Sequence, residues 1–180
     1  GWYANVNPLV VFLLVNFITS FMKKHTALTS MTIGMLIIPL SALVMAGGTL
    51  IGSENILGMH PVAFMMIIGI AMQAVAECFI SPRFLEYFSL QSPKGEEGLY
   101  LGFSHLHSFF SYLFAFGLSG FLLEKYVPDP KGFDTVEAYA KATEHAHYIW
   151  FVFVGIGLVS ALALLIYGYV TRRIDKKKAV

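Results

Sequence analysis

Charged residues are scarce in this sequence. Asp, Glu, Lys and Arg make up 13% of its 180 residues, against about 25% in soluble domains, while 57% of the residues are hydrophobic. The charges almost cancel, leaving a formal net charge of +1, which argues against a nucleic-acid partner. The mean hydropathy of +0.68 and the long apolar runs predict an all-α integral membrane protein that lies in the lipid bilayer.

Cysteine is almost absent as well. The single Cys78 excludes an internal disulfide, and it is most simply a small buried apolar side chain. The sequence contains no CxxC pair, HExxH motif or nucleotide-binding glycine loop, so we expect no metal and no cofactor. An enzyme acting inside the membrane needs a paired acid, a nucleophile or a metal cluster within its spans. The spans contain one carboxylate, so we expect no enzymatic activity.

Apolar stretches of spanning length recur along the chain. Five are expected to form transmembrane helices, at about 6–22, 31–51, 61–82, 99–123 and 148–170. The longest connection is an outer loop at 124–147, in which 134–146 has the composition of a short surface helix. The sequence opens inside what reads as a loop, without a methionine or a signal peptide. We therefore expect it to be a fragment of a longer polypeptide.

Basic residues are divided unevenly between the two sets of helix ends. One set contains nine of them, Lys23, Lys24, Arg83, Lys94, Arg172, Arg173, Lys176, Lys177 and Lys178. The opposite set contains only Lys125, Lys131 and Lys141. Because cytoplasmic loops are enriched in Lys and Arg, we expect a cytoplasmic C-terminus. With five crossings, Gly1 is then outside.

Glu77 is the only acidic residue inside a long apolar run. Since a carboxylate at the bilayer centre costs several kcal/mol, Glu77 is expected to face protein or a water-filled cavity. Gln73, Glu77 and Ser81 are spaced i, i+4, i+8, so a helix places them in one polar stripe. Pro82 follows directly and is expected to kink or loosen the helix. The stripe predicts a ligand or ion site, and the alternative is an interhelical hydrogen bond that only locks packing.

The fourth span carries a second set of polar residues. Ser104, Ser108 and Ser111 form a stripe of small side chains, which is typical of a close helix–helix seam. His105 and His107 are two residues apart and therefore point to different faces of a helix. This spacing is poor for a shared metal ion, and a proton-relay role is the other reading of these histidines.

Three features together resemble one known family. VNPLVVFLL (6–14) is similar to the opening of the eighth helix of proton-coupled oligopeptide transporters, the POT or PTR family of the major facilitator superfamily. AECFISPRFLEYFSLQSP (76–93) is similar to the tenth helix of that family, and Gly102 follows where its eleventh helix begins. The five segments then resemble helices eight to twelve. This makes 1–180 a C-terminal transmembrane half-domain and the N-terminal half of the same transporter its missing partner.

The resemblance implies a multi-pass protein of the cell (inner) membrane that takes up di- or tripeptides together with protons by alternating access. Glu77 would bind the amino terminus of the peptide and take part in proton coupling, and Asn7 and Gln73 would line the same cavity. Ser104 stands where many members have tryptophan, and Ser108 lies one turn deeper, so both are substrate-binding candidates. The alternatives are a carrier of another small solute, such as nitrate, another anion or an amino-acid derivative, and a non-transporting membrane subunit.

Overall fold

The computed structural model describes residues 5–52 and 55–178, with side chains up to residue 174. Over these ranges the structure is helical, which confirms the predicted all-α class. Its elements are α1 (Val6–Met22), α2 (Ala27–Gly47), α3 (Pro61–Gln91), α4 (Glu97–Ser104), α5 (Leu106–Tyr126), the 3-10 turn η2 (Pro130–Gly132), α6 (Val136–Ala142) and α7 (Tyr148–Lys178).

Four helical segments are long and apolar enough to cross a membrane, namely Ala27–Gly47, Pro61–Gln91, Glu97–Gly132 and Tyr148–Ile174. They correspond to the last four predicted spans. α1 is also apolar, but it contains 17 residues, which extend about 26 Å at 1.5 Å per residue. A bilayer core is about 30 Å thick. The prediction for 6–22 is therefore confirmed as a helix, and its crossing of the membrane stays a prediction.

The second predicted span, 31–51, is displaced from the observed helix by about one turn. α2 begins at Ala27 because Thr26 caps it: the Thr26 hydroxyl accepts a hydrogen bond from the Thr29 amide at 3.3 Å. Threonine is a favourable N-cap because it satisfies an amide that has no partner within the helix. The polar stretch assigned to a connection therefore contributes the first turn of the helix.

α3 continues through Pro82 to Gln91, so the helix extends beyond the predicted span of 61–82. Proline removes one backbone donor from the helix. Close to the place of this missing donor, the Ser30 hydroxyl of α2 donates a hydrogen bond of 2.8 Å to the carbonyl of Phe79. One turn later Arg83, only 6% exposed, forms an ion pair with Glu86. These contacts support the helix beyond the proline.

The fourth predicted span, 99–123, is two helices rather than one. α4 ends at Ser104 and α5 begins at Leu106. At the junction the His105 amide donates to the Gly102 carbonyl at 3.2 Å, and the Ser108 amide donates to the His105 carbonyl at 3.0 Å. Such i→i−3 bonds interrupt the regular i→i−4 ladder. The Ser104 hydroxyl also bonds back to the Leu101 carbonyl at 2.7 Å, a pattern that favours bending.

The fifth predicted span, 148–170, lies inside a longer helix, since α7 runs on to Lys178. The outer loop contains the predicted surface helix as α6. Its N-cap is Thr135, whose hydroxyl accepts a hydrogen bond from the Ala138 amide. α7 thus continues into polar residues that the apolar pattern does not mark, while α6 is shorter than the predicted 134–146.

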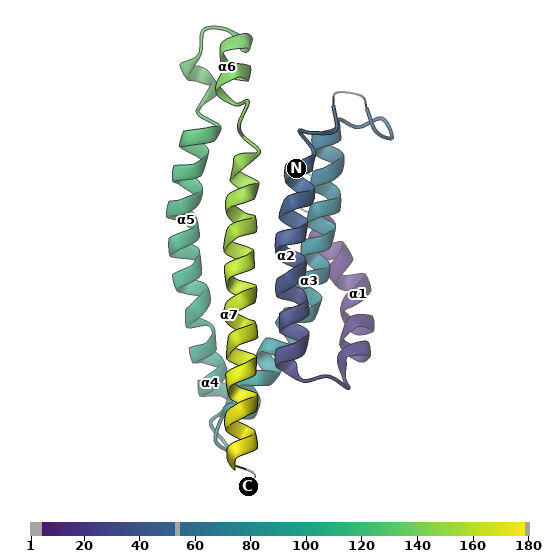
Figure 1. Cartoon of the computed structure of the whole chain (residues 1–180), viewed down its shortest axis with the longest axis vertical. Coiled ribbons are helices and arrows are strands. Elements are labelled where there is room, and N and C mark those ends of the chain that lie inside the picture. Colours follow the sequence, from purple (N-terminus) through teal and green to yellow (C-terminus); the bar gives the residue numbers. More distant parts are fainter. Residues whose placement is uncertain (1–4, 53–54, 179–180) are drawn as a thin grey trace.

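α2 packs between α3 and α7, and α1 packs on α3 (Figure 1). Glycines set the two close approaches of α2. A Cβ atom on Gly34 would lie 2.5 Å from Ile80 Cγ1 and 2.7 Å from the Ala76 carbonyl oxygen. A Cβ on Gly157 of α7 would lie 3.0 Å from Pro39 Cδ. On the other side of α3, Cys78 is buried against α1, as predicted.

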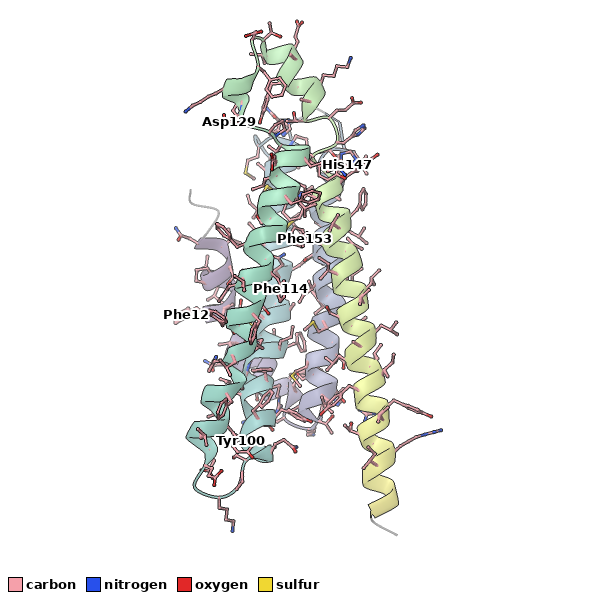
Figure 2. The ribbon with its side chains drawn as sticks, turned by 90° about the vertical axis from the view of Figure 1, so that its left-hand side faces the viewer. Phe12, Tyr100, Phe114, Asp129, His147 and Phe153 are labelled. Atoms are coloured by element: carbon pink, nitrogen blue, oxygen red, sulfur yellow. The ribbon has the colours of Figure 1, made fainter. Side chains whose placement is uncertain are left out.

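α5 lies beside α7 and contacts it only sparsely (Figure 1). Its surface is apolar and aromatic: Phe114 is 73% exposed, and Phe12 on α1 is 79% exposed (Figure 2). Exposed aromatic and aliphatic side chains along helices of spanning length are what a lipid environment accommodates. These helices support a multi-pass membrane protein.

The helix ends divide into the two predicted sets. The α1–α2 and α3–α4 connections lie at the same end of the molecule as the C-terminal end of α7, while η2 and α6 lie at the other end (Figure 1). We call the first of these the basic end, because its described side chains include Lys23, Lys24, Lys94, Arg172 and Arg173. That it faces the cytoplasm stays a prediction. Gly1 and the side chains of Lys176, Lys177 and Lys178 lie outside the described residues.

Candidate functional site

The polar stripe on α3 faces a cavity of about 300 Å³. Gln73, Glu77 and Ser81 all line it, as their helical spacing predicts. The remaining wall comes from Asn7 of α1, Ile38 of α2 and Ile80 of α3. Three helices that are separate in the sequence therefore meet around the Glu77 carboxylate.

Asn7 contacts Glu77 directly. Its side-chain amide Nδ2 donates a hydrogen bond to Glu77 Oε2, with 3.2 Å between the two atoms. Asn7 is in the first turn of α1, where a capping role is the usual expectation, but its side chain crosses to α3 instead. Neighbouring Asn5 makes no side-chain capping bond either. The first turn of α1 thus serves to present Asn7 to the cavity.

The Glu77 carboxylate remains accessible despite this hydrogen bond. The side chain is exposed, and Gln73 and Asn7 are partly exposed. No second hydrogen bond to Glu77 comes from the residues that the structure describes. An ionised carboxylate accepts hydrogen bonds at two oxygens, so Glu77 has acceptor capacity left for a cation, an ammonium group or a proton.

A second cavity, of about 330 Å³, adjoins the first. Ile38 and Gln73 line both cavities and stand at their boundary. The second cavity lies between α2, α3 and α7, and its other lining residues are Met35, Ala42, Trp150, Phe153, Ile156, Gly157 and Ser160. The sequence analysis assigned none of these residues to a site. Apart from Ser160 these residues are apolar, and apolar residues are found all along a spanning helix.

Ser104 and Ser108 do not line the Glu77 cavity. Ser104 is buried, and its hydroxyl bonds to the carbonyl of Leu101 in its own helix. The Ser108 hydroxyl lies 3.4 Å from His107 Nε2, and the His107 ring packs against Phe84 with 4.8 Å between ring centroids. The structure therefore brings Asn7, Gln73 and Glu77 together and places the two serines elsewhere. A substrate contact at Ser104 or Ser108 stays a prediction.

The described residues contain no cluster of three or more His, Cys, Asp or Glu side chains placed to hold a metal ion. His105 and His107 flank the α4–α5 junction rather than the cavity. The polar lining of the site thus consists of one carboxylate, two side-chain amides and the Ser81 hydroxyl. Such a set binds hydrogen-bond donors and positive charge.

Comparison with protein-family models, with curated proteins and with solved structures returned no match for this chain. The resemblance to peptide transporters accordingly rests on the motifs at 6–14 and 76–93. What this resemblance implies about function is a proposal.

Proposed function

We propose that the chain forms part of the substrate and proton site of a secondary active transporter, which takes up di- or tripeptides together with protons. The observation that carries the proposal is the Glu77 carboxylate, which lies in the wall of a 300 Å³ cavity and is hydrogen-bonded to Asn7. The helices around it include two that are long enough to span a membrane. Ionisable groups within membrane spans are expensive and usually mark transport or proton pathways.

The carboxylate suits an amine-bearing substrate. An ammonium group forms charge-assisted hydrogen bonds with a carboxylate, and these are roughly twice as strong as neutral ones. Gln73 and Asn7 add amide groups that bind peptide carbonyl and N–H groups. The cavity of about 300 Å³ falls at the lower end of the volumes found for small-molecule sites, which agrees with a short peptide rather than a large ligand.

The same carboxylate provides a means of coupling. When Glu77 is ionised it attracts an ammonium group, and when it is protonated that attraction is lost. Protonation of Glu77 therefore releases the ammonium group, and Asn7 holds one of the carboxylate oxygens in place through the 3.2 Å hydrogen bond. For uptake together with a proton, substrate binds the ionised carboxylate from outside, and a proton that enters through another group of the carrier reaches Glu77 after closure and frees the substrate inside.

The proposal includes a second set of helices on the open side of the cavity. In a major facilitator architecture, substrate binds near the bilayer midplane between two six-helix halves. Under the proposal, the described helices are the eighth to twelfth, the C-terminal end of α7 is cytoplasmic, and a lysine from the other half pairs with Glu77. The exposure of Glu77 leaves its carboxylate accessible to such a partner.

Uptake measurements test the assignment. Cells that produce the polypeptide containing this chain are supplied with a labelled dipeptide at several external pH values, with and without a protonophore. We expect uptake that rises as the external pH falls and that collapses with the protonophore. Unlabelled dipeptide should compete, whereas nitrate should not, because an anion is repelled by the ionised Glu77. Uptake that does not change when the protonophore collapses the proton gradient would exclude the proposed coupling. Competition by nitrate alone would exclude the proposed substrate.

A further inference from the structure

A third cavity, of about 250 Å³, lies between α2 and α7 at the basic end of the molecule. Farther from the basic end, the two helices are in close contact where Gly157 of α7 meets Pro39 of α2. Ala161 of α7, one turn after Gly157, is buried. Towards the basic end the helices leave a cleft whose apolar wall is formed by Leu28, Leu164 and Leu165. The cleft shares no lining residue with the Glu77 cavity.

Polar groups gather at one part of this cleft. Arg172 lines it, and its Nη2 donates a hydrogen bond to the Thr29 hydroxyl at 3.0 Å. This bond ties α7 to the first turn of α2 and holds the guanidinium beside the cavity. Since a guanidinium has five N–H donors and Arg172 is exposed, donors remain for a ligand. Tyr169 also lines the cleft, and the guanidinium of Arg173 lies 4.7 Å from the centre of its ring.

The surrounding charge is positive. The stretch 172–178 contains five basic residues and one acidic residue, and the α1–α2 connection at the same end contributes Lys23 and Lys24 (Figure 1). Each basic residue close to an anionic membrane surface contributes attraction towards it. Free phosphate would use only the guanidinium, whereas the leucine wall next to Arg172 matches a ligand with an apolar tail attached to its phosphate.

We propose that the α2–α7 cleft binds an anionic phospholipid, with the phosphate at Arg172 and the start of an acyl chain against Leu28, Leu164 and Leu165. Basic pockets between transmembrane helices are suited to such headgroups. The lipid bridges the two helices across the cleft and so stabilises the packing of α7 on α2. This site is independent of the function proposed for Glu77.

The site is tested by binding of short-chain phosphatidylglycerol to the purified full chain in detergent, with phosphatidylcholine and inorganic phosphate as separate ligands. Tyrosine or tryptophan fluorescence and the ligand-dependent rise in Tm provide the readouts. We expect phosphatidylglycerol to bind at least about fivefold more tightly than phosphatidylcholine. Arg172→Gln should remove about fivefold of that affinity, which corresponds to ~1 kcal/mol for one basic residue.

A steric variant tests the apolar part without changing the charge. Gly168 lines the cleft, and a Cβ added to it meets no atom within 4 Å, so Gly168→Leu fills the cavity without a backbone clash. Gly155 of the same helix is equally open and lies outside the cleft, so Gly155→Leu is the matched control. We expect weaker phosphatidylglycerol binding only in Gly168→Leu. Equal affinity for the two phospholipids would overturn the proposal, as would displacement of phosphatidylglycerol by an equal concentration of inorganic phosphate.

Discussion

The side-chain amide of Asn7 donates a hydrogen bond to the carboxylate of Glu77 across 70 residues of sequence, with 3.2 Å between Nδ2 and Oε2. The bond joins α1 to the middle of α3 and fixes the Glu77 side chain. It also leaves the carboxylate open to the cavity. The hydrogen bond anchors α1 to α3. It also positions the Glu77 carboxylate next to the cavity.

Removing the amide should have a moderate effect. Asn7→Ala deletes one hydrogen bond to Glu77 while the carboxylate and the cavity remain. We expect peptide uptake to fall by about tenfold, because a hydrogen bond to a charged group is worth roughly 1.5 kcal/mol or more. The measurement is the initial rate of uptake against substrate concentration. Asn16→Ala is the matched control, because Asn16 is an exposed residue of the same helix. Equal losses in both variants would mean that the helix, rather than the hydrogen bond, is affected.

Packing of α2 against α3 depends on a glycine. Gly34→Ala introduces a Cβ that would lie 2.5 Å from Ile80 Cγ1 and 2.7 Å from a backbone oxygen. The helices must therefore separate, and we expect a loss of about 1–3 kcal/mol in the free energy of unfolding, the usual cost of overpacking. Tm of the purified chain in detergent measures the effect. Gly155→Ala, at an open position, should leave Tm nearly unchanged. A stable Gly34→Ala protein would show that the α2–α3 contact is looser than described.

The side of the membrane is tested by labelling single cysteines. In a Cys78→Ala background, cysteine is placed at Lys94 in the α3–α4 connection or at Lys131 in η2. The positive-inside rule places position 94 in the cytoplasm and position 131 outside. A membrane-impermeant maleimide added to intact cells should therefore label position 131 and not position 94. The reverse pattern would contradict the predicted orientation.

Much of the fold could be predicted from the apolar pattern. Spanning helices can be recognised by the length and composition of their apolar stretches. The stripe of Gln73, Glu77 and Ser81 follows from helical periodicity alone. Helix ends were harder, because they depend on local hydrogen bonds that composition does not show. Because Thr26 caps α2, the helix begins one turn before the predicted start at residue 31. The i→i−3 bonds at His105 divide the fourth predicted span into two helices.

The partners of Glu77 could be predicted only in part. Gln73 is one turn away on the same helix, so its position follows from spacing. Asn7 is 70 residues away, and only the resemblance to transporters singled it out. Ile38 and the lining of the second cavity carry no sequence signal, because isoleucine and phenylalanine are ordinary in any spanning helix. Ser104 and Ser108 were chosen by resemblance, and the break at His105 puts them on either side of a helix junction.

The central claim is that the charge of Glu77 binds substrate and couples it to protons. Glu77→Gln tests this claim most directly, because glutamine keeps the size and much of the hydrogen bonding of the side chain and removes only the charge. The matched control is Glu137→Gln, the same change in an exposed residue of α6. Both variants should reach the membrane in normal amounts.

The deciding measurement is gradient-driven uptake of a labelled dipeptide by cells producing the native protein or either variant in equal amounts. We expect Glu137→Gln to transport like the native protein and Glu77→Gln to lose at least about tenfold, since a charged hydrogen bond contributes ~1.5–3 kcal/mol. Uptake by Glu77→Gln at the native rate would contradict the claim and reduce Glu77 to a residue that only packs α3 against α1.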